Sequence, residues 1–283
     1  MTVRRVDVDA RWLMAFAASI GDTKPVHLDT TVPGGIVGHP LFGICAEWPL
    51  LRDLDLSRLG GAVEGTPLFV HGAHDVTIRR LVRPGDRLVS TSLIGGIEAK
   101  TSGVLVHYLL ETVDAEGLPV SSSRYGIYAL GTRLVGAPVP ITGETPLWGV
   151  DTFDLLSPDY ESAVELGAGL AHTYTECARI FNSIHTDTMA AHAAGLKGPI
   201  LHGSATLATA VSTIVDQACG GDPAALARVT ARFASTVTLP CTLRVRWQEA
   251  KVGVIPFRVL GPGDIVVVDR ASVTLRKLND EAS

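Results

Sequence analysis

The segment 179–187, with the sequence RIFNSIHTD, places a histidine three residues after an asparagine and two residues before an aspartate. His185 can accept or donate a proton near neutral pH, because the ordinary pKa of a histidine is about 6.5. Shortly afterwards GPILHGSATLATA places a glycine, Gly203, at the start of a run that fits a helix. Backbone N–H groups at a helix start can receive a negatively charged oxygen. The two segments together predict proton transfer beside an oxyanion site.

Both segments have counterparts earlier in the chain. GDTKPVHLD resembles RIFNSIHTD, GHPLFG resembles GPILHG, and a proline near the start of a strand recurs in each half. Matched residues are separated by nearly constant offsets of 158, 160 and 156 residues (His27 and His185, Gly43 and Gly203, Pro84 and Pro240). This order and spacing predict two copies of one unit, at 1–131 and 151–283. The segment 131–150 is rich in glycine and proline and is interpreted as the linker between them.

Each copy shows the same order of predicted elements. Apolar residues at helical spacing predict one helix that ends near Gly21 and a longer one that begins near Ser204 and ends at Gly220. A helix is also expected after Gly43, although Pro49 makes its middle doubtful. Runs bounded by turn residues predict four strands per copy: 67–80, 87–98, 101–113 and 119–130, then 226–236, 241–249, 253–259 and 265–276. Helices followed by antiparallel strands indicate the α+β class.

Composition argues against several function classes. Hydrophobic residues make up 46% of the 283 residues and charged residues 19%, which is typical of a globular protein. The net charge of -5 and the interspersed signs provide no basic patch for nucleic acid and no polybasic anchor for a membrane. No apolar run approaches the ~18 residues of a membrane-spanning helix. The four cysteines are scattered, which is typical of reduced thiols and predicts a cytoplasmic protein.

Other histidines have simpler explanations. His71 and His74 are close enough in sequence for a metal site, but no third ligand lies near them. We interpret them as a surface pair or as hydrogen-bonded residues, and His107 as a hydrogen-bonded core residue. We therefore expect no metal, and no motif indicates a redox cofactor.

The order of the motifs resembles the MaoC-like hydratases and dehydratases. H-x-D, then G-x-x-x-x-G at a helix start, then RPGD before a strand follow the order seen in that family. The clearest match is 179–210, where NSIHTD and AAGLKGPILHGSATLA follow the family string N-P-x-H-x-D...A-G-x-x-x-P-I-x-H-G. The resemblance covers nearly the whole chain and extends to the two-copy type 2 enoyl-CoA hydratases. It implies a tandem, or double, hotdog fold, in which two curved antiparallel sheets each wrap a helix.

The resemblance also implies an activity and a set of site residues. Such enzymes are lyases of fatty acid metabolism that add water to an α,β-unsaturated acyl thioester, or remove it from a 3-hydroxyacyl thioester, with (R) specificity. Coenzyme A or an acyl carrier protein carries the substrate, and no cofactor is implied. The implied roles are base for His185, orientation or substrate binding for Asn182, and oxyanion site for Gly203. Residues expected to contact the substrate or its water are Ser183, Ser204 and His202.

One expected group is missing from the second copy. The family string has an aspartate five residues before the histidine, where this chain has Ile180. In the first copy Asp22 and His27 keep that spacing, but Lys24 replaces the asparagine. Three interpretations stay open: catalysis by the second copy, catalysis by the first-copy pair, or a non-catalytic acyl-binding partner subunit. A thioesterase is a further alternative, because hotdog folds also host that reaction.

Several properties are not specified by the sequence. These are the acyl chain length, the pathway, the carrier and the direction of the reaction. Two copies can close a pseudo-dimer by themselves, so a homodimer is allowed but not required.

Overall fold

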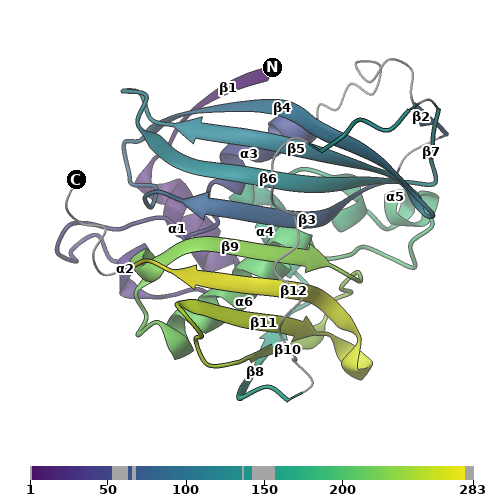
Figure 1. Cartoon of the computed structure of the whole chain (residues 1–283). Coiled ribbons are helices and arrows are strands. Elements are labelled where there is room, and N and C mark those ends of the chain that lie inside the picture. The colour runs from purple at the N-terminus through teal and green to yellow at the C-terminus, as the bar shows by residue number, and fades with distance from the viewer. Residues whose placement is uncertain (1, 53–62, 66–67, 136, 142–156, 278–283) are drawn as a thin grey trace.

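The computed structural model describes residues 2–52, 63–65, 68–135, 137–141 and 157–277 (Figure 1). Ten strands form one antiparallel sheet in the order β1-β4-β5-β6-β3-β9-β12-β11-β10-β8. The first five in chain order are β1 (Thr2–Asp7), β3 (Leu68–Ile78), β4 (Arg87–Lys100), β5 (Gly103–Val113) and β6 (Pro119–Leu130). The other five are β8 (Tyr160–Leu166), β9 (Leu226–Phe233), β10 (Cys241–Trp247), β11 (Val254–Leu260) and β12 (Val266–Leu275).

The sheet repeats its own order on either side of the junction between β3 and β9. Outward from that junction, one half runs β3-β6-β5-β4-β1 and the other runs β9-β12-β11-β10-β8. When the five strands that each copy contributes to this sheet are numbered along the chain, both halves have the spatial order second, fifth, fourth, third and first. The chain is therefore α+β with a duplicated strand order, as the repeated motifs predicted.

The eight predicted strands correspond to β3–β6 and β9–β12, with ends that differ by at most three residues. Sequence patterns missed β1 and β8, which form the two edges of the sheet. Most of their side chains are exposed or half-buried. Such strands lack the alternation of buried apolar residues that marks a strand in sequence. Each copy therefore contributes five strands instead of the predicted four.

Helices pack behind the sheet in the view of Figure 1. The first copy contributes α1 (Ala10–Ser19), α2 (Pro25–Leu28) and α3 (Ile44–Arg52), and the second contributes α4 (Leu170–Ala178), α5 (Thr188–Ala193) and α6 (Gly203–Ala218). Helix α3 continues through Pro49, although a proline disfavours a helix interior. Helix α4 was not predicted from the sequence.

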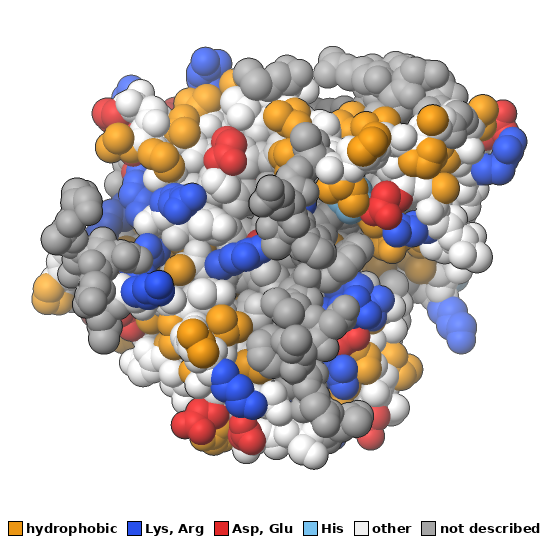
Figure 2. Space-filling view, viewed as in Figure 1, with side chains coloured by type: hydrophobic (Ala, Val, Ile, Leu, Met, Phe, Trp, Pro, Cys, Tyr) orange, Lys and Arg blue, Asp and Glu red, His pale blue; other side chains and the backbone are white. Residues whose placement is uncertain are grey.

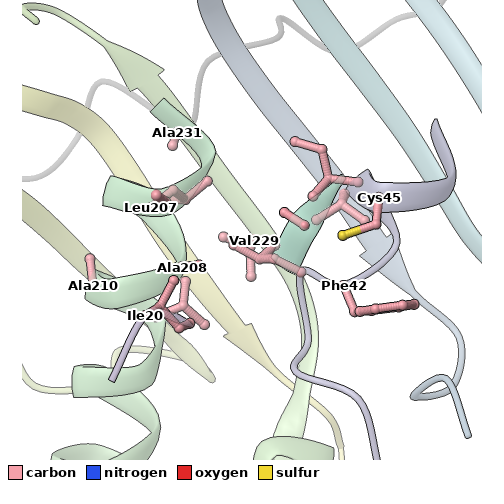
Figure 3. Close-up of a cluster of buried hydrophobic side chains, with 14 of the residues drawn as sticks. Ile20, Phe42, Cys45, Leu207, Ala208, Ala210, Val229 and Ala231 are labelled. Carbon is pink, nitrogen blue, oxygen red and sulfur yellow. The ribbon is translucent and has the colours of Figure 1, made fainter. Parts of the chain in front are cut away.

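The core surrounds α6 on most sides. Leu207, Ala208 and Ala210 of this helix are fully buried in one cluster with Val229 and Ala231 of β9 (Figure 3). Alanines on a buried helix let its backbone approach the sheet closely, and a helix that is apolar all round belongs in the interior. The apolar stripe seen in the sequence therefore packs against the sheet, as expected.

The two copies are joined at β3 and β9. These strands pair directly, and Arg228 donates two hydrogen bonds across the junction to the Asp75 carboxylate, at 2.7 and 2.6 Å. The described part of the expected linker is also structured, because β7 (Arg133–Leu134) pairs with β2 (Val63–Glu64) and Val139 bridges to Ile97. Residue 136 and residues 142–150 of that linker lie outside the described residues. The boundaries 1–131 and 151–283 stay predictions.

Charged side chains are dispersed over the surface. On the face shown in Figure 2, lysines and arginines alternate with acidic, polar and apolar side chains. None of the helices in the described part of the chain is long and apolar enough to cross a membrane.

Candidate active site

A cavity of about 370 Å³ lies between the two copies. Side chains of α3 and β3 from the first copy line it together with second-copy side chains of β9, the segment 180–185 and the start of α6. Most of the second-copy residues predicted from the sequence line this cavity: Asn182, His185, His202, Gly203 and Ser204. Ser183 was also predicted, but it is not among the lining residues. Cavities of ~300–1,000 Å³ are typical of small-molecule sites, so the predicted residues meet where a substrate can bind.

His185 is a buried, neutral base. Its Nδ1 lies 2.8 Å from the carbonyl oxygen of Ile200. A carbonyl only accepts, so Nδ1 carries the proton and Nε2 keeps a lone pair. Burial lowers the pKa of His185 to about 4, although the hydrogen bond to Ile200 opposes this shift. At pH 7 the ring is therefore unprotonated at Nε2 and able to accept a proton.

Asn182 positions the turn that carries His185. Its side-chain oxygen accepts a hydrogen bond from the Ile184 N–H at 3.4 Å, at the start of the 3₁₀ turn η2 (Ser183–His185). The turn follows Arg179, which ends α4 in a left-handed conformation with φ of 57°. The Arg179 guanidinium lies 3.9 Å from the centre of the Trp12 ring in α1. A first-copy aromatic residue thus helps to hold the segment that carries the second-copy histidine.

His202 lies against His185. The two rings are stacked with centroids 3.6 Å apart, and Nε2 of His202 donates to the carbonyl oxygen of Ile180 at 3.2 Å. Burial, together with the nearby His185, lowers the pKa of His202 to about 2. His202 therefore stays neutral, and its main effect is to hold the His185 ring and the backbone at Ile180.

Gly203 opens α6 at the cavity. A Cβ at this position would lie 3.2 Å from the Phe233 ring, which is tighter than most contacts of a Cβ and would require the ring or the helix start to shift slightly. The N–H groups of Gly203 and Ser204 have no backbone acceptor among the described residues, as expected for the first turn of a helix. The Ser204 hydroxyl accepts a hydrogen bond from the Tyr174 hydroxyl at 3.0 Å. The N–H groups at the helix start are therefore free of backbone acceptors among the described residues and available to a charged oxygen.

Ile180 occupies the wall of the same cavity. Its side chain is 1% exposed and lines the cavity near His185. It places hydrocarbon where the resemblance implies a carboxylate. None of the described residues that line the cavity is an aspartate or glutamate, so these residues contain no substitute for the missing acid.

The first-copy pair lies in a closed environment. Nδ1 of His27 is 2.8 Å from the Val37 carbonyl oxygen, the same arrangement as in His185. Its Nε2 is 3.6 Å from a carboxylate oxygen of Asp22. His27 is fully buried, Asp22 is 4% exposed, and neither lines the cavity. The sequence correctly paired these two residues but could not show that they lack access to the cavity.

Partners from α6 and α2 surround Asp22. The Ser212 hydroxyl donates to its carboxylate at 2.7 Å, and the Lys24 ammonium lies 2.7 Å away. Burial pushes the pKa of Asp22 up, but His39, Lys24, His27 and Ser212 together outweigh burial and lower it. Asp22 is therefore an ion held by neighbours, an arrangement that suits a structural role.

The first-copy wall of the cavity was missed by sequence reasoning. His71 and Trp48 line it, and nothing in their local sequence indicates this. The interpretation as a surface or hydrogen-bonded pair was wrong for His74, whose two ring nitrogens are both buried without a partner among the described residues, whereas His71 is half-buried and hydrogen-bonds to the Ala73 backbone through its ring. His107 is hydrogen-bonded to Glu98 at 2.5 Å, as predicted. In the described part of the chain, no three metal-binding side chains come together.

The ten-stranded antiparallel sheet takes five strands from each copy, with α3 packed against first-copy strands and α6 against second-copy strands, and this architecture defines a double-hotdog protein. Residues 158–258 match the family model described as "MaoC like domain", and residues 1–122 match that of the "FAS1-like, dehydratase domain region". The chain therefore carries a MaoC-like dehydratase domain in its second half and a FAS1-like dehydratase region in its first.

Similar proteins agree with this assignment. The chain is 42% identical to peroxisomal enoyl-CoA hydratase 2 of Arabidopsis thaliana over 57 residues, which are 20% of this chain and 18% of the relative. It is 27% identical to the peroxisomal multifunctional enzyme type 2 of Drosophila melanogaster over 183 residues, 64% of this chain and 30% of the relative. The chain thus spans less than a third of the length of these two relatives. The crystal structure of a MaoC-like dehydratase from Phytophthora capsici superposes with a TM-score of 0.81 at 21% identity, covering 98% of this chain and 95% of the other.

Proposed function

We propose that the chain hydrates α,β-unsaturated acyl thioesters, or dehydrates the corresponding 3-hydroxyacyl thioesters, in the cavity between its two copies. The observation that carries this proposal is the convergence of His185, Asn182 and Gly203 on that cavity. An unprotonated base and unpaired helix N–H groups are what water addition to an enoyl thioester requires. The MaoC-like domain and the similarity to enoyl-CoA hydratase 2 support the same chemistry.

In the proposed mechanism His185 performs both proton transfers. Its Nε2 takes a proton from water while the water oxygen bonds to the β-carbon of the substrate. The electron pair of the double bond then moves toward the thioester oxygen, where the N–H groups of Gly203 and Ser204 receive the enolate charge. The imidazolium returns the proton to the α-carbon, so water adds with no net change in protons. Ile180 takes no part, because a hydrocarbon side chain neither donates nor accepts a proton.

The remaining properties are also proposals. Coenzyme A or an acyl carrier protein would carry the acyl group, and the mechanism uses an imidazole and backbone N–H groups, without a metal or redox cofactor. The (R) specificity and a role in fatty acid metabolism rest on the resemblance of the 179–210 motif. A cytoplasmic location and a homodimer stay predictions, and the Arabidopsis and Drosophila relatives are named peroxisomal.

One observation favours a second candidate, a non-catalytic acyl-binding subunit. Ile180 stands where the family string places an aspartate near the histidine, yet the cavity is present and Gly203 and Ser204 line it. A protein that retains an acyl thioester without converting it would show this combination. A thioesterase would need a carboxylate beside the attacking water, and no observation on the described residues favours that reaction.

The test is loss of enoyl absorbance when the purified chain is mixed with crotonyl-CoA and longer enoyl-CoA thioesters. We expect His185→Gln to lower kcat by about 10²–10⁴, the usual contribution of a general base. The matched control is His27→Gln, which removes the corresponding first-copy ring and should retain activity. If only His27→Gln loses activity, the catalytic base lies in the first copy. An inert unmutated chain that still binds acyl-CoA would support the binding subunit.

A further inference from the structure

A β-bulge at Gly72 shapes the first-copy wall of the cavity. β3 and β6 pair residue by residue except between His71 and Ala73, where the register shifts. In a regular strand residues 71 and 74 would point to opposite faces of the sheet. Here both histidine rings pack against Tyr125, with centroid distances of 5.4 and 4.4 Å. The bulge therefore turns His71 to the inner face, where it lines the cavity.

His71 and Trp48 line this wall, and each has a buried ring nitrogen without a hydrogen-bond partner among the described residues. Within the described residues, neither Nε2 of His71 nor Nε1 of Trp48 has a hydrogen-bond partner, and both atoms are buried. Their ring centroids are 6.4 Å apart, and both residues line the cavity. Burying an unpaired polar nitrogen is costly, so such groups call for an explanation. A ligand that pairs with both would remove that cost.

The two nitrogens differ in hydrogen-bonding character. The indole N–H of Trp48 can only donate. Burial lowers the pKa of His71 to about 3, although a hydrogen bond with the Ala73 backbone raises it, so the ring is neutral at pH 7. A bond that raises the pKa is one in which the ring donates, which leaves Nε2 of His71 with its lone pair. One donor beside one acceptor matches a hydroxyl group, which can both accept and donate.

Phe233 separates this pair from the reacting end of the cavity. Its ring centroid is 4.4 Å from that of His71, and its edge lies 3.2 Å from where a Cβ on Gly203 would be. A hydroxyl beside His71 would therefore be bound along the acyl chain and not at the carbons that react. The neighbouring wall includes Phe69 and Leu130, which suit the hydrocarbon between the two points.

We propose that this cavity selects acyl thioesters whose chain carries a hydroxyl group remote from the thioester. The hydroxyl accepts a hydrogen bond from Nε1 of Trp48 and donates one to Nε2 of His71. Because both nitrogens are buried, both rings must turn toward the cavity for the hydroxyl to reach them. This inference rests on the proposed function only in placing the thioester at Gly203 and His185.

The test compares 2-decenoyl-CoA with a series of analogues that carry one hydroxyl group moved along the chain. We expect kcat/KM for the best analogue to exceed that of the parent compound by about tenfold, because a site with buried polar groups disfavours a ligand that leaves them unpaired. His71→Phe and Trp48→Phe should each reduce this ratio to about one. The matched control is His74→Phe, three residues along the same strand and outside the cavity wall, which should keep the ratio.

Calorimetric binding of decanoyl-CoA and its hydroxylated analogues separates this inference from the proposed function. If the chain converts no enoyl thioester but binds a hydroxylated analogue about tenfold more tightly, and His71→Phe removes that preference, the inference stands while the hydratase proposal fails. The inference is overturned if the parent compound has a kcat/KM or an affinity equal to that of every hydroxylated analogue. It is also overturned if His71→Phe retains the preference for the hydroxylated analogue.

Discussion

His185 and His27 show how two copies of one motif acquire different roles. In both, Nδ1 donates to a backbone carbonyl at 2.8 Å, so each ring presents Nε2 to its surroundings. For His185 those surroundings include the cavity, whereas Nε2 of His27 faces the Asp22 carboxylate in a closed interior. In the proposed mechanism, the difference between the reactive base and the structural ring is access to the cavity.

The pH dependence should report His185 directly. We predict that kcat/KM for an enoyl thioester is constant between about pH 6 and pH 8 and falls only as the pH drops through about 4. The rate falls in acid because His185 must be unprotonated to act as the base. The fall occurs at an unusually low pH because burial holds the pKa of His185 below its ordinary value. A pH–rate profile measures this, and an acid limb centred near 6.5 would show that the ring is fully solvated.

Restoring a carboxylate at position 180 should change that profile. In Ile180→Asp the negative charge near His185 stabilises the imidazolium, so we expect the acid limb to shift upward by about one pH unit or more. Ile180→Asn has a similar shape without the charge and should leave the limb in place. Equal profiles for the two variants would show that the side chain at 180 does not act on the base.

The start of α6 should tolerate no side chain. Gly203→Ala places a Cβ 3.2 Å from the Phe233 ring, so the helix start or the ring must move. We expect kcat to fall by about 10²-fold, within the range for losing one oxyanion donor. The control is Gly198→Ala, where a Cβ meets nothing within 4 Å. Steady-state kinetics check both variants, and an unchanged kcat in Gly203→Ala would separate this glycine from catalysis.

At the scale of elements, α6 serves both copies. Its first residues face the cavity, and further along the helix Ser212 donates to Asp22 at 2.7 Å. Lys24 lies between Asp22 and Asp216 of the same helix, at 2.7 and 2.9 Å. Asp22 and Lys24 thus anchor the helix whose other end opens at the cavity.

Asp22→Asn should therefore affect stability more than activity. We expect the free energy of unfolding to fall by about 1–3 kcal/mol at pH 7, because a buried ion loses its charge while its partners remain. The lowered pKa of folded Asp22 means that its contribution is present above the unfolded value of 3.8 and is lost as the pH falls below it. Urea unfolding at pH 7 and near pH 3 should show the difference from the unmutated chain shrinking in acid. A large loss of kcat with unchanged stability would contradict this role.

At the scale of the whole molecule, one sheet connects the copies. The junction pairs β3 with β9, and the half-exposed Arg228 holds the buried Asp75 across it with two hydrogen bonds. Since the cavity takes walls from both sides of this junction, the site depends on the copies staying together.

Arg228→Met should lower the stability of both copies together. It leaves the Asp75 carboxylate without its partner, so we expect a loss of about 1–3 kcal/mol in the free energy of unfolding. Unfolding should remain a single transition, with circular dichroism and tryptophan fluorescence changing together. Two separate transitions would show that the copies fold independently.

What the sequence alone determined is local. Turn residues and alternating apolar residues located eight strands, helical spacing located α1 and α6, and motif order located five second-copy residues that line the cavity. These features depend on neighbours in the chain, which the sequence states directly. The sequence patterns did not identify the edge strands β1 and β8, because their side chains do not form a buried face.

Only the tertiary structure decided which of these residues share a site. The burial of Asp22 and His27, the hydrocarbon of Ile180 beside His185, and the placement of His71 in the same wall all depend on contacts between distant segments. His71 shows the reason most clearly, because a one-residue bulge at Gly72 changes which face its side chain occupies. Sequence periodicity assigns faces to a regular strand, and a register shift alters that assignment without altering the pattern of residue types.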